Sequence, residues 1–135
     1  MITLGETARK VRHVSAEDIK VFANMCEDFN PLHHDAEYAA ASRFGGIIAS
    51  GPHYVSLLMG LLATHFAQHG PQVGVECAVR FVKPVRAGDT LEYKWVVVAI
   101  EPKSRGDIVS LEGSITNQGG ETVLTASSKI LAIRE

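Results

Sequence analysis

The length, composition and charge of the chain describe an ordinary globular protein. Its 135 residues suit one domain spanning residues 1–135, large enough to bury a core without disulfides. The content is 46% hydrophobic and 21% charged, and the net charge of −2 gives no electrostatic bias toward nucleic acid, so we expect no nucleic-acid partner. The two cysteines, Cys26 and Cys77, are too far apart for a C-x-x-C metal site, and we expect both to be reduced and packed.

The N-terminal third of the chain is predicted to be helical after a short extended start. Residues 1–10 contain no charged segment followed by a long apolar run, so the sequence predicts a cytoplasmic protein without a secretory signal. Ser15 is suited to cap a helix whose first turn carries two acids. Apolar residues then recur with helical spacing, at Ile19, Phe22, Ala23 and Cys26. This helix should end before Pro31, because the residue ahead of a proline avoids the α region.

The segment between Asp28 and Asp35 reads D-F-N-P-L-H-H-D and gathers groups that can handle protons. It contains a carboxylate, a carboxamide and an imidazole, on Asp28, Asn30 and His33, around a proline that stiffens the backbone. A helix exit of this kind often displays functional side chains from a rigid support. The octapeptide is therefore the leading candidate for acid–base chemistry.

The last two residues of the octapeptide, His34 and Asp35, are also ligand types for a metal ion. As neighbours in sequence they point in different directions, which argues against a shared ion. Asp35 is better interpreted as the N-cap of a short helix over residues 36–43, followed by a turn at residues 45–46. We therefore predict no metal site at this position.

A strongly apolar helix is predicted from Pro52 to about Gln68. Pro52 suits the first turn of a helix, where its missing N–H removes no intrahelical bond. The helix is apolar on nearly every side and should therefore be enclosed by other structure. Its most apolar part, residues 54–67, would reach about 21 Å as a helix, short of the roughly 30 Å hydrocarbon layer of a membrane. We therefore expect no membrane partner.

The two ends of this helix carry further candidate residues. His65 and His69 are four residues apart, as zinc ligands on a helix are, but the residues between them lack the glutamate of a zinc protease. A histidine is favourable near a helix C-terminus, so we interpret the pair as structural and predict no metal site. Ser50 is outside any G-x-S-x-G elbow and is interpreted as a helix-capping or substrate-contacting hydroxyl.

The second half of the chain is predicted to form strands. Apolar residues alternate over residues 73–81, 91–99, 109–115 and 122–133, with turn sequences at residues 86–89 and 117–120. The expected fold class is α+β. It consists of an antiparallel sheet of four strands, or five with an N-terminal one, curved around one central helix.

The order of these segments resembles the MaoC-like dehydratases, also called R-specific enoyl-CoA hydratases. The resemblance rests on D-F-N-P-L-H-H-D, then F-G-G-I-I-A-S-G before the apolar helix, then R-F-V-K-P-V-R-A-G-D-T-L. It covers nearly the whole chain and implies a hot-dog fold and a homodimer whose sheets join. It also implies hydration of a trans-2-enoyl-CoA to the (3R)-hydroxyacyl-CoA, or the reverse dehydration, with an acyl-CoA as substrate and no cofactor.

The resemblance also implies roles for individual residues. Asp28 and His33 match the catalytic pair of the family, and Asn30 matches the amide that helps to hold it. Gly51 matches the glycine whose backbone N–H receives the thioester oxygen. One water molecule held between a carboxylate and an imidazole supplies the hydroxyl group for C3 and the proton for C2.

The start of the apolar helix departs from the commonest pattern of the family. Many members have histidine where Ser50 stands, and no proline directly after the glycine. Pro52 has no N–H to donate, so the remaining nearby backbone donors are Gly51 and His53. We expect Ser50 and Gly51, with Asn30, to contact the substrate.

Two other classes of function stay open from the sequence. Related hot-dog proteins are thioesterases, which would release free thiol from a saturated acyl-CoA. The third class is a non-catalytic acyl-binding or dimerisation subunit of a larger dehydratase complex. Such subunits often lack the acid–base pair, which this chain retains.

No individual basic residue is assigned to coenzyme A, because these residues are scattered: Arg43, Arg80, Lys83, Arg86, Lys103 and Arg105.

Overall fold

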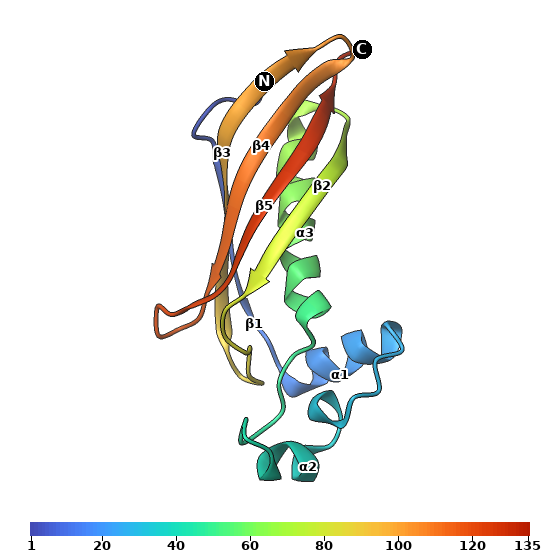
Figure 1. The fold of residues 1–135 in the computed structure, drawn as a ribbon, viewed down its shortest axis with the longest axis vertical. Helices are drawn as coiled ribbons and strands as arrows, with labels where there is room; N and C mark the ends of the chain where they lie inside the picture. The colour runs from blue at the N-terminus through green and yellow to red at the C-terminus, as the bar shows by residue number, and fades with distance from the viewer.

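The computed structural model describes residues 1–135 and contains one five-stranded antiparallel sheet with a long helix along one face (Figure 1). In space the strands follow the order β1-β3-β4-β5-β2. Their bounds are β1 (Thr7–His13), β2 (Gln72–Phe81), β3 (Thr90–Lys103), β4 (Gly106–Thr116) and β5 (Thr122–Ile133). The predicted α+β class is confirmed, and the N-terminal strand is present as β1.

The helices fall into one long element and several short ones. They are α1 (Ala16–Met25), the 3-10 helix η1 (Pro31–His33), α2 (Ala36–Ala41), α3 (Gly51–Phe66) and the 3-10 helix η2 (Ala67–His69). Helix α3 runs along the sheet, while α1 and α2 lie beyond one end of it (Figure 1). Ser15 caps α1 as predicted, since its hydroxyl accepts a hydrogen bond from the Asp18 N–H at 3.0 Å. None of these helices combines the length and the apolarity that crossing a bilayer requires.

The core joins the sheet to α3 around Trp95. Its indole ring is fully buried, and its N–H donates to the carbonyl oxygen of Leu58 on α3 at 2.8 Å. Gly113 pairs with Trp95 across the sheet, where an added Cβ would lie 2.7 Å from the ring. Glycine is therefore needed at this point of β4 because the indole occupies the space of a side chain.

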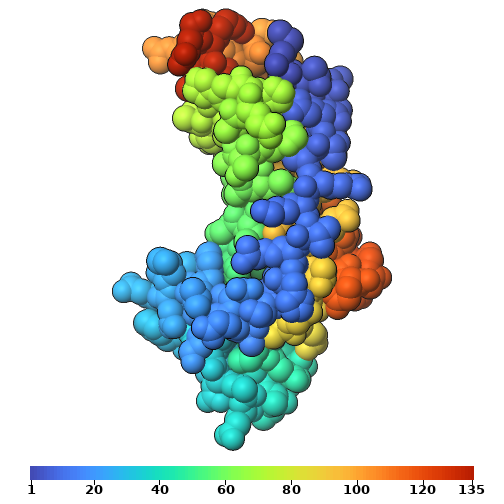
Figure 2. All heavy atoms as spheres, turned by 180° about the vertical axis from the view of Figure 1, so that it is seen from behind, coloured from blue at the N-terminus to red at the C-terminus, as the bar shows by residue number.

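Helix α3 is covered on one face only within the single chain. The buried side chains recur with helical spacing, and all but His53 belong to the core cluster that the helix shares with the sheet: His53, Tyr54, Leu58, Leu62 and Phe66. On other sides Gly60 and Thr64 are exposed, and Leu57 and Leu61 are half-buried. Seen from behind, the green atoms of α3 reach the surface of the molecule (Figure 2). The complete enclosure predicted for this helix is thus not reached within one chain.

Strand β2 departs from the predicted alternation. Its pairing with β5 shifts register between Gly74 and Glu76, so Val73 and Cys77 lie on opposite faces of the sheet. The strand is at the edge of the sheet, and most of its side chains are exposed. Both Cys77 and Cys26 are exposed, so the prediction that the cysteines are packed is wrong. Cys77 is on an edge strand, and Cys26 is in the C-cap of α1.

Candidate active site

Asp28 is positioned by the way in which α1 ends. The helix stops at Met25, before the proline that was expected to limit it. The Glu27 N–H donates to the Asn24 carbonyl oxygen at 3.1 Å and the Asp28 N–H to that of Ala23 at 2.9 Å, as in a Schellman C-cap. Glu27 takes the left-handed conformation that glycine usually takes there, with φ of 58°. Such a residue stores about 1–3 kcal/mol of strain, directly before the candidate acid.

The loop after Asp28 is held by hydrogen bonds from its own side chains. Asp28 Oδ1 accepts from the Asn30 N–H at 3.1 Å, and Asn30 Oδ1 accepts from the Leu32 N–H at 3.1 Å. The Asn30 side chain thus caps η1, and the direct interaction that it makes is with the loop itself. His34 donates from Nε2 to the Asp28 carbonyl oxygen at 2.7 Å, and Asp35 caps α2 as predicted.

His33 is buried and held in one tautomer. Its Nδ1 lies 2.7 Å from the carbonyl oxygen of Ile48. A carbonyl oxygen can only accept, so Nδ1 carries the proton and Nε2 of the neutral ring has a free lone pair. This Nε2 lies 3.4 Å from Asp28 Oδ2. The structure therefore brings the imidazole and the carboxylate of the predicted pair together, with two proton-accepting atoms facing each other.

The same hydrogen bonds tie the His33 turn to the start of α3. Besides accepting from His33, Ile48 donates its N–H to the Leu32 carbonyl oxygen at 3.2 Å. The next residue, Ala49, donates to the Val85 carbonyl oxygen at 2.8 Å. The acid–base pair and the N-terminus of α3 are therefore held in one hydrogen-bonded frame, although they are separate in sequence.

A cleft with a volume of about 510 Å³ lies between His33 and the start of α3. Six of its lining residues come from the segments just described and from the end of β2: His33, Gly51, Tyr54, Phe81, Lys83 and Pro84. Gly51 is the first residue of α3, and its N–H has no intrahelical acceptor and no loop acceptor. The backbone offers a free donor to a ligand in this cleft.

Phe81 explains why residue 51 has no side chain. A Cβ on Gly51 would lie 2.8 Å from the Phe81 ring, closer than real contacts allow. The Phe81 ring also packs edge-on against Tyr54, with the ring centroids 5.9 Å apart. Phe81 and Lys83 were not singled out from the sequence, because their place in the cleft depends on how β2 returns past the helix start.

Ser50 and His53 behave differently from the expectations. Ser50 is the N-cap residue of α3, but its hydroxyl makes no capping hydrogen bond, so the capping role is wrong. Its buried Oγ has no hydrogen-bond partner within the chain, and Ser50 is not among the residues that line the cleft. The His53 N–H donates to the Ser50 carbonyl oxygen at 3.0 Å, which leaves Gly51 as the free backbone donor.

The His53 side chain packs against α1 and does not line the cleft. Its ring is buried and stacks on Phe22, with centroids 4.7 Å apart. Burial lowers the pKa of His53, with a smaller opposing effect from the Asp18 carboxylate. Burial thus disfavours the charged form of this ring.

The comparisons with known proteins agree with this architecture. The family model of the MaoC like domain matches residues 4–118. An (R)-specific enoyl-CoA hydratase of Aeromonas caviae is 30% identical over 129 residues, which cover 96% of this chain and 94% of that protein. A UPF0336 protein of Streptomyces avermitilis is 31% identical over 127 residues, covering 88% of this chain and 83% of that protein.

A solved structure extends the similarity to three dimensions. The (R)-hydratase from A. caviae involved in PHA biosynthesis matches with a TM-score of 0.88 at 30% identity, over 96% of each chain. The family match covers most of the chain, and the sheet wrapped along one helix agrees with that fold. The chain therefore belongs to the MaoC-like domain family and has its hot-dog fold.

Proposed function

We propose that this protein hydrates trans-2-enoyl-CoA thioesters to (3R)-hydroxyacyl-CoA and catalyses the reverse dehydration. The observation that carries the proposal is the pair of Asp28 Oδ2 and His33 Nε2, 3.4 Å apart beside a cleft that also holds a free backbone N–H. The names of the relatives, among them an (R)-specific enoyl-CoA hydratase, support the same reaction class.

The acid–base pair would act through one bound water molecule. Asp28 and the unprotonated Nε2 of His33 both accept hydrogen bonds, so a water between them can present its lone pair to C3 of the enoyl group. As the C3–O bond forms, one water proton passes to the pair and the π electrons move onto the thioester oxygen as an enolate. The enolate then takes a proton from the pair at C2, which restores both groups. Acid–base catalysis of this kind typically contributes about 10²–10⁴-fold, and it requires no cofactor.

The start of α3 would stabilise the enolate oxygen. The Gly51 N–H is free and lies at the N-terminus of a 16-residue helix, where the helix dipole favours negative charge. Ser50, the residue before Gly51, has a partnerless hydroxyl, but this oxygen is buried and Ser50 does not line the cleft, so Gly51 is the donor on which the proposal rests. A thioester oxygen placed here would gain interactions as charge builds on it, which is the condition for faster turnover.

Replacing Gly51 with Ala should lower kcat/KM for a short enoyl-CoA by at least about tenfold, because the new Cβ and the Phe81 ring must move apart around the oxygen site. Steady-state kinetics measure the change in kcat/KM, and a thermal melt measures any change in stability separately. The matched control is Gly60→Ala in the same helix, where nothing lies within 4 Å of an added Cβ. That change should keep the activity and raise stability by about 0.5–1 kcal/mol. If Gly51→Ala and Gly60→Ala have the same kcat/KM, the Gly51 N–H does not take part in the reaction.

A homodimer joined through β2 is part of the proposal. The free edge of β2 carries exposed apolar residues, including Val73 and Val75 with exposed fractions of 50% and 53%. The opposite edge, β1, carries three cations, at Arg9, Lys10 and Arg12. Charged residues protect an edge from pairing, whereas an apolar edge invites it. A second copy paired along β2 would satisfy the free backbone groups and approach the uncovered side of α3.

The reaction itself is tested by adding a short trans-2-enoyl-CoA and following the loss of enoyl absorbance. The expected product is the 3-hydroxyacyl-CoA of R configuration, which a chiral assay or an R-specific dehydrogenase identifies. Release of free thiol from a saturated acyl-CoA without hydration would indicate a thioesterase instead. Activity that appears only after a different subunit is added would indicate a partner within a larger dehydratase complex.

A further inference from the structure

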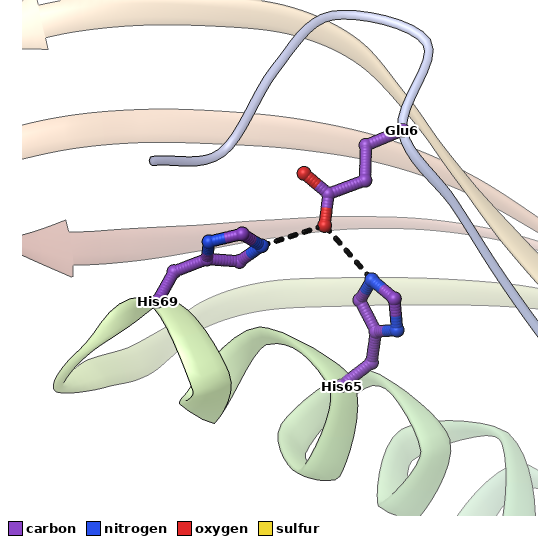
Figure 3. Close-up of side chains that lie close together, drawn as sticks. All are labelled: Glu6, His65 and His69. Carbon is purple, nitrogen blue, oxygen red and sulfur yellow. Dashed lines mark hydrogen bonds and ion pairs between the residues drawn. The ribbon is translucent and has the colours of Figure 1, made fainter.

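A second cluster of chemically active side chains lies at the opposite end of α3 from Gly51. Glu6, directly before β1, reaches across to His65 on α3 and His69 on η2 (Figure 3). Glu6 Oε2 lies 2.8 Å from His65 Nε2 and 2.7 Å from His69 Nε2. A third potential ligand, the Glu6 carboxylate, thus joins the two histidines from the N-terminal segment.

The three ligand atoms have the spacing of a metal site. All of them lie within 4.8 Å of one another. A tetrahedral zinc ion with bonds of about 2.0–2.1 Å holds its ligand atoms about 3.3 Å apart, so small side-chain rotations suffice to admit the ion. The two histidines are four residues apart on consecutive helical turns, which places both rings on one side. The C-terminal end of a helix also favours a cation.

The surroundings of the cluster support ligation. The second carboxylate oxygen, Glu6 Oε1, accepts from the Thr3 N–H at 3.2 Å, which orients the group and leaves Oε2 toward the histidines. The side chains of Glu6, His65 and His69 are 17%, 27% and 24% exposed, so an ion can enter while most of each ligand stays ordered.

We propose that Glu6, His65 and His69 bind a divalent transition-metal ion, with zinc as the best fit. Imidazole and carboxylate ligands suit zinc, and three protein ligands leave the fourth tetrahedral position for a water molecule. On binding, each neutral imidazole carries its proton on Nδ1, and its Nε2 lone pair turns from the carboxylate to the ion. For His69 this requires Nδ1 to give up its contact with the Met1 ammonium, which lies 3.2 Å away. The ion fastens the N-terminal segment and β1 to the end of α3. The site is separate from the acid–base pair and does not depend on the proposed hydratase activity.

Zinc titration of the metal-free 135-residue chain tests the proposal. Isothermal calorimetry should show one zinc ion per chain, and Co²⁺ should give the visible absorption of a four-coordinate site. Glu6→Gln, His65→Gln and His69→Gln should each weaken zinc binding at least about tenfold, since each removes one ligand. The matched control is His13→Gln, because His13 is an exposed imidazole outside the cluster. Both cysteines remain in every variant, so any zinc that they bind is the same in wild type and in all variants.

A thermal melt distinguishes a metal site from a cluster in which Glu6, His65 and His69 only form hydrogen bonds with one another. Zinc at a hundredfold excess over its Kd should raise the Tm of wild type and His13→Gln by about 5–10 °C. Glutamine at position 6 still accepts hydrogen bonds from both imidazoles, so Glu6→Gln should fold normally and lose this rise. If wild type binds no zinc, or if the three cluster variants bind it as tightly as wild type, the proposal is overturned.

Discussion

Replacing Asp28 with Asn, or His33 with Gln, is expected to lower the turnover of a trans-2-enoyl-CoA by at least about a hundredfold. Asparagine cannot take a proton from water, and glutamine removes the Nε2 lone pair that faces Asp28 Oδ2 at 3.4 Å. Glutamine can still donate to the Ile48 carbonyl oxygen, which His33 now contacts at 2.7 Å, so the loop should stay in place. Single-turnover kinetics with wild type and variants at equal concentration measure the loss in the chemical step.

The control for this prediction is Asp35→Asn in the same octapeptide. Asp35 caps α2 by accepting from the Tyr38 N–H, and asparagine caps a helix about equally well. The turnover of the Asp35→Asn variant should therefore stay within about twofold of wild type. Circular dichroism checks that all variants are folded. Wild-type turnover in both Asp28→Asn and His33→Gln would show that the chemistry occurs elsewhere.

Replacing Val75 with Lys on β2 is expected to weaken the dimer at least about a hundredfold. Residue 75 lies at the register shift of β2 with 53% exposure, and a two-fold axis brings two new cations toward the same interface. Sedimentation velocity over a concentration series measures the monomer fraction. The loss of enoyl-CoA hydration in the monomeric fraction would further indicate that the cleft depends on the partner subunit.

Val11→Lys provides a matched control on the opposite edge of the sheet. Val11 is on β1, has an exposed fraction of 60%, and receives the same substitution. It should leave the dimer intact, since β1 already carries cations on both sides of this residue. The reverse result, in which Val11→Lys dissociates the protein and Val75→Lys does not, would place the interface on β1.

Features with a local physical cause could be predicted from the sequence. The Ser15 cap of α1 and the Asp35 cap of α2 depend on side chains within three residues of the N–H groups that they accept from. Strand β3 alternates because one face of the sheet is buried, and Trp95 on that face is fully enclosed. These periodicities were sufficient for the α+β class and for the central helix.

Features that depend on packing were missed. Cys77 belongs to an apolar alternation, yet it is exposed because β2 is at the sheet edge and shifts register beside it. Ser50 has the residue type of an N-cap, yet its hydroxyl does not cap α3. Neither the edge position of a strand nor the rotamer of a buried hydroxyl is encoded in local spacing.

The sequence by itself determined the candidate acid–base pair, because Asp28 and His33 are five residues apart around a proline-stiffened turn. Only the tertiary structure decided how that pair meets the free N–H of Gly51, since the connection passes through Ile48. It alone also brought Glu6 to His65 and His69, which are about sixty residues away in the chain. Local backbone preferences act over a few residues, whereas contacts between distant segments form only when the sheet and α3 pack together.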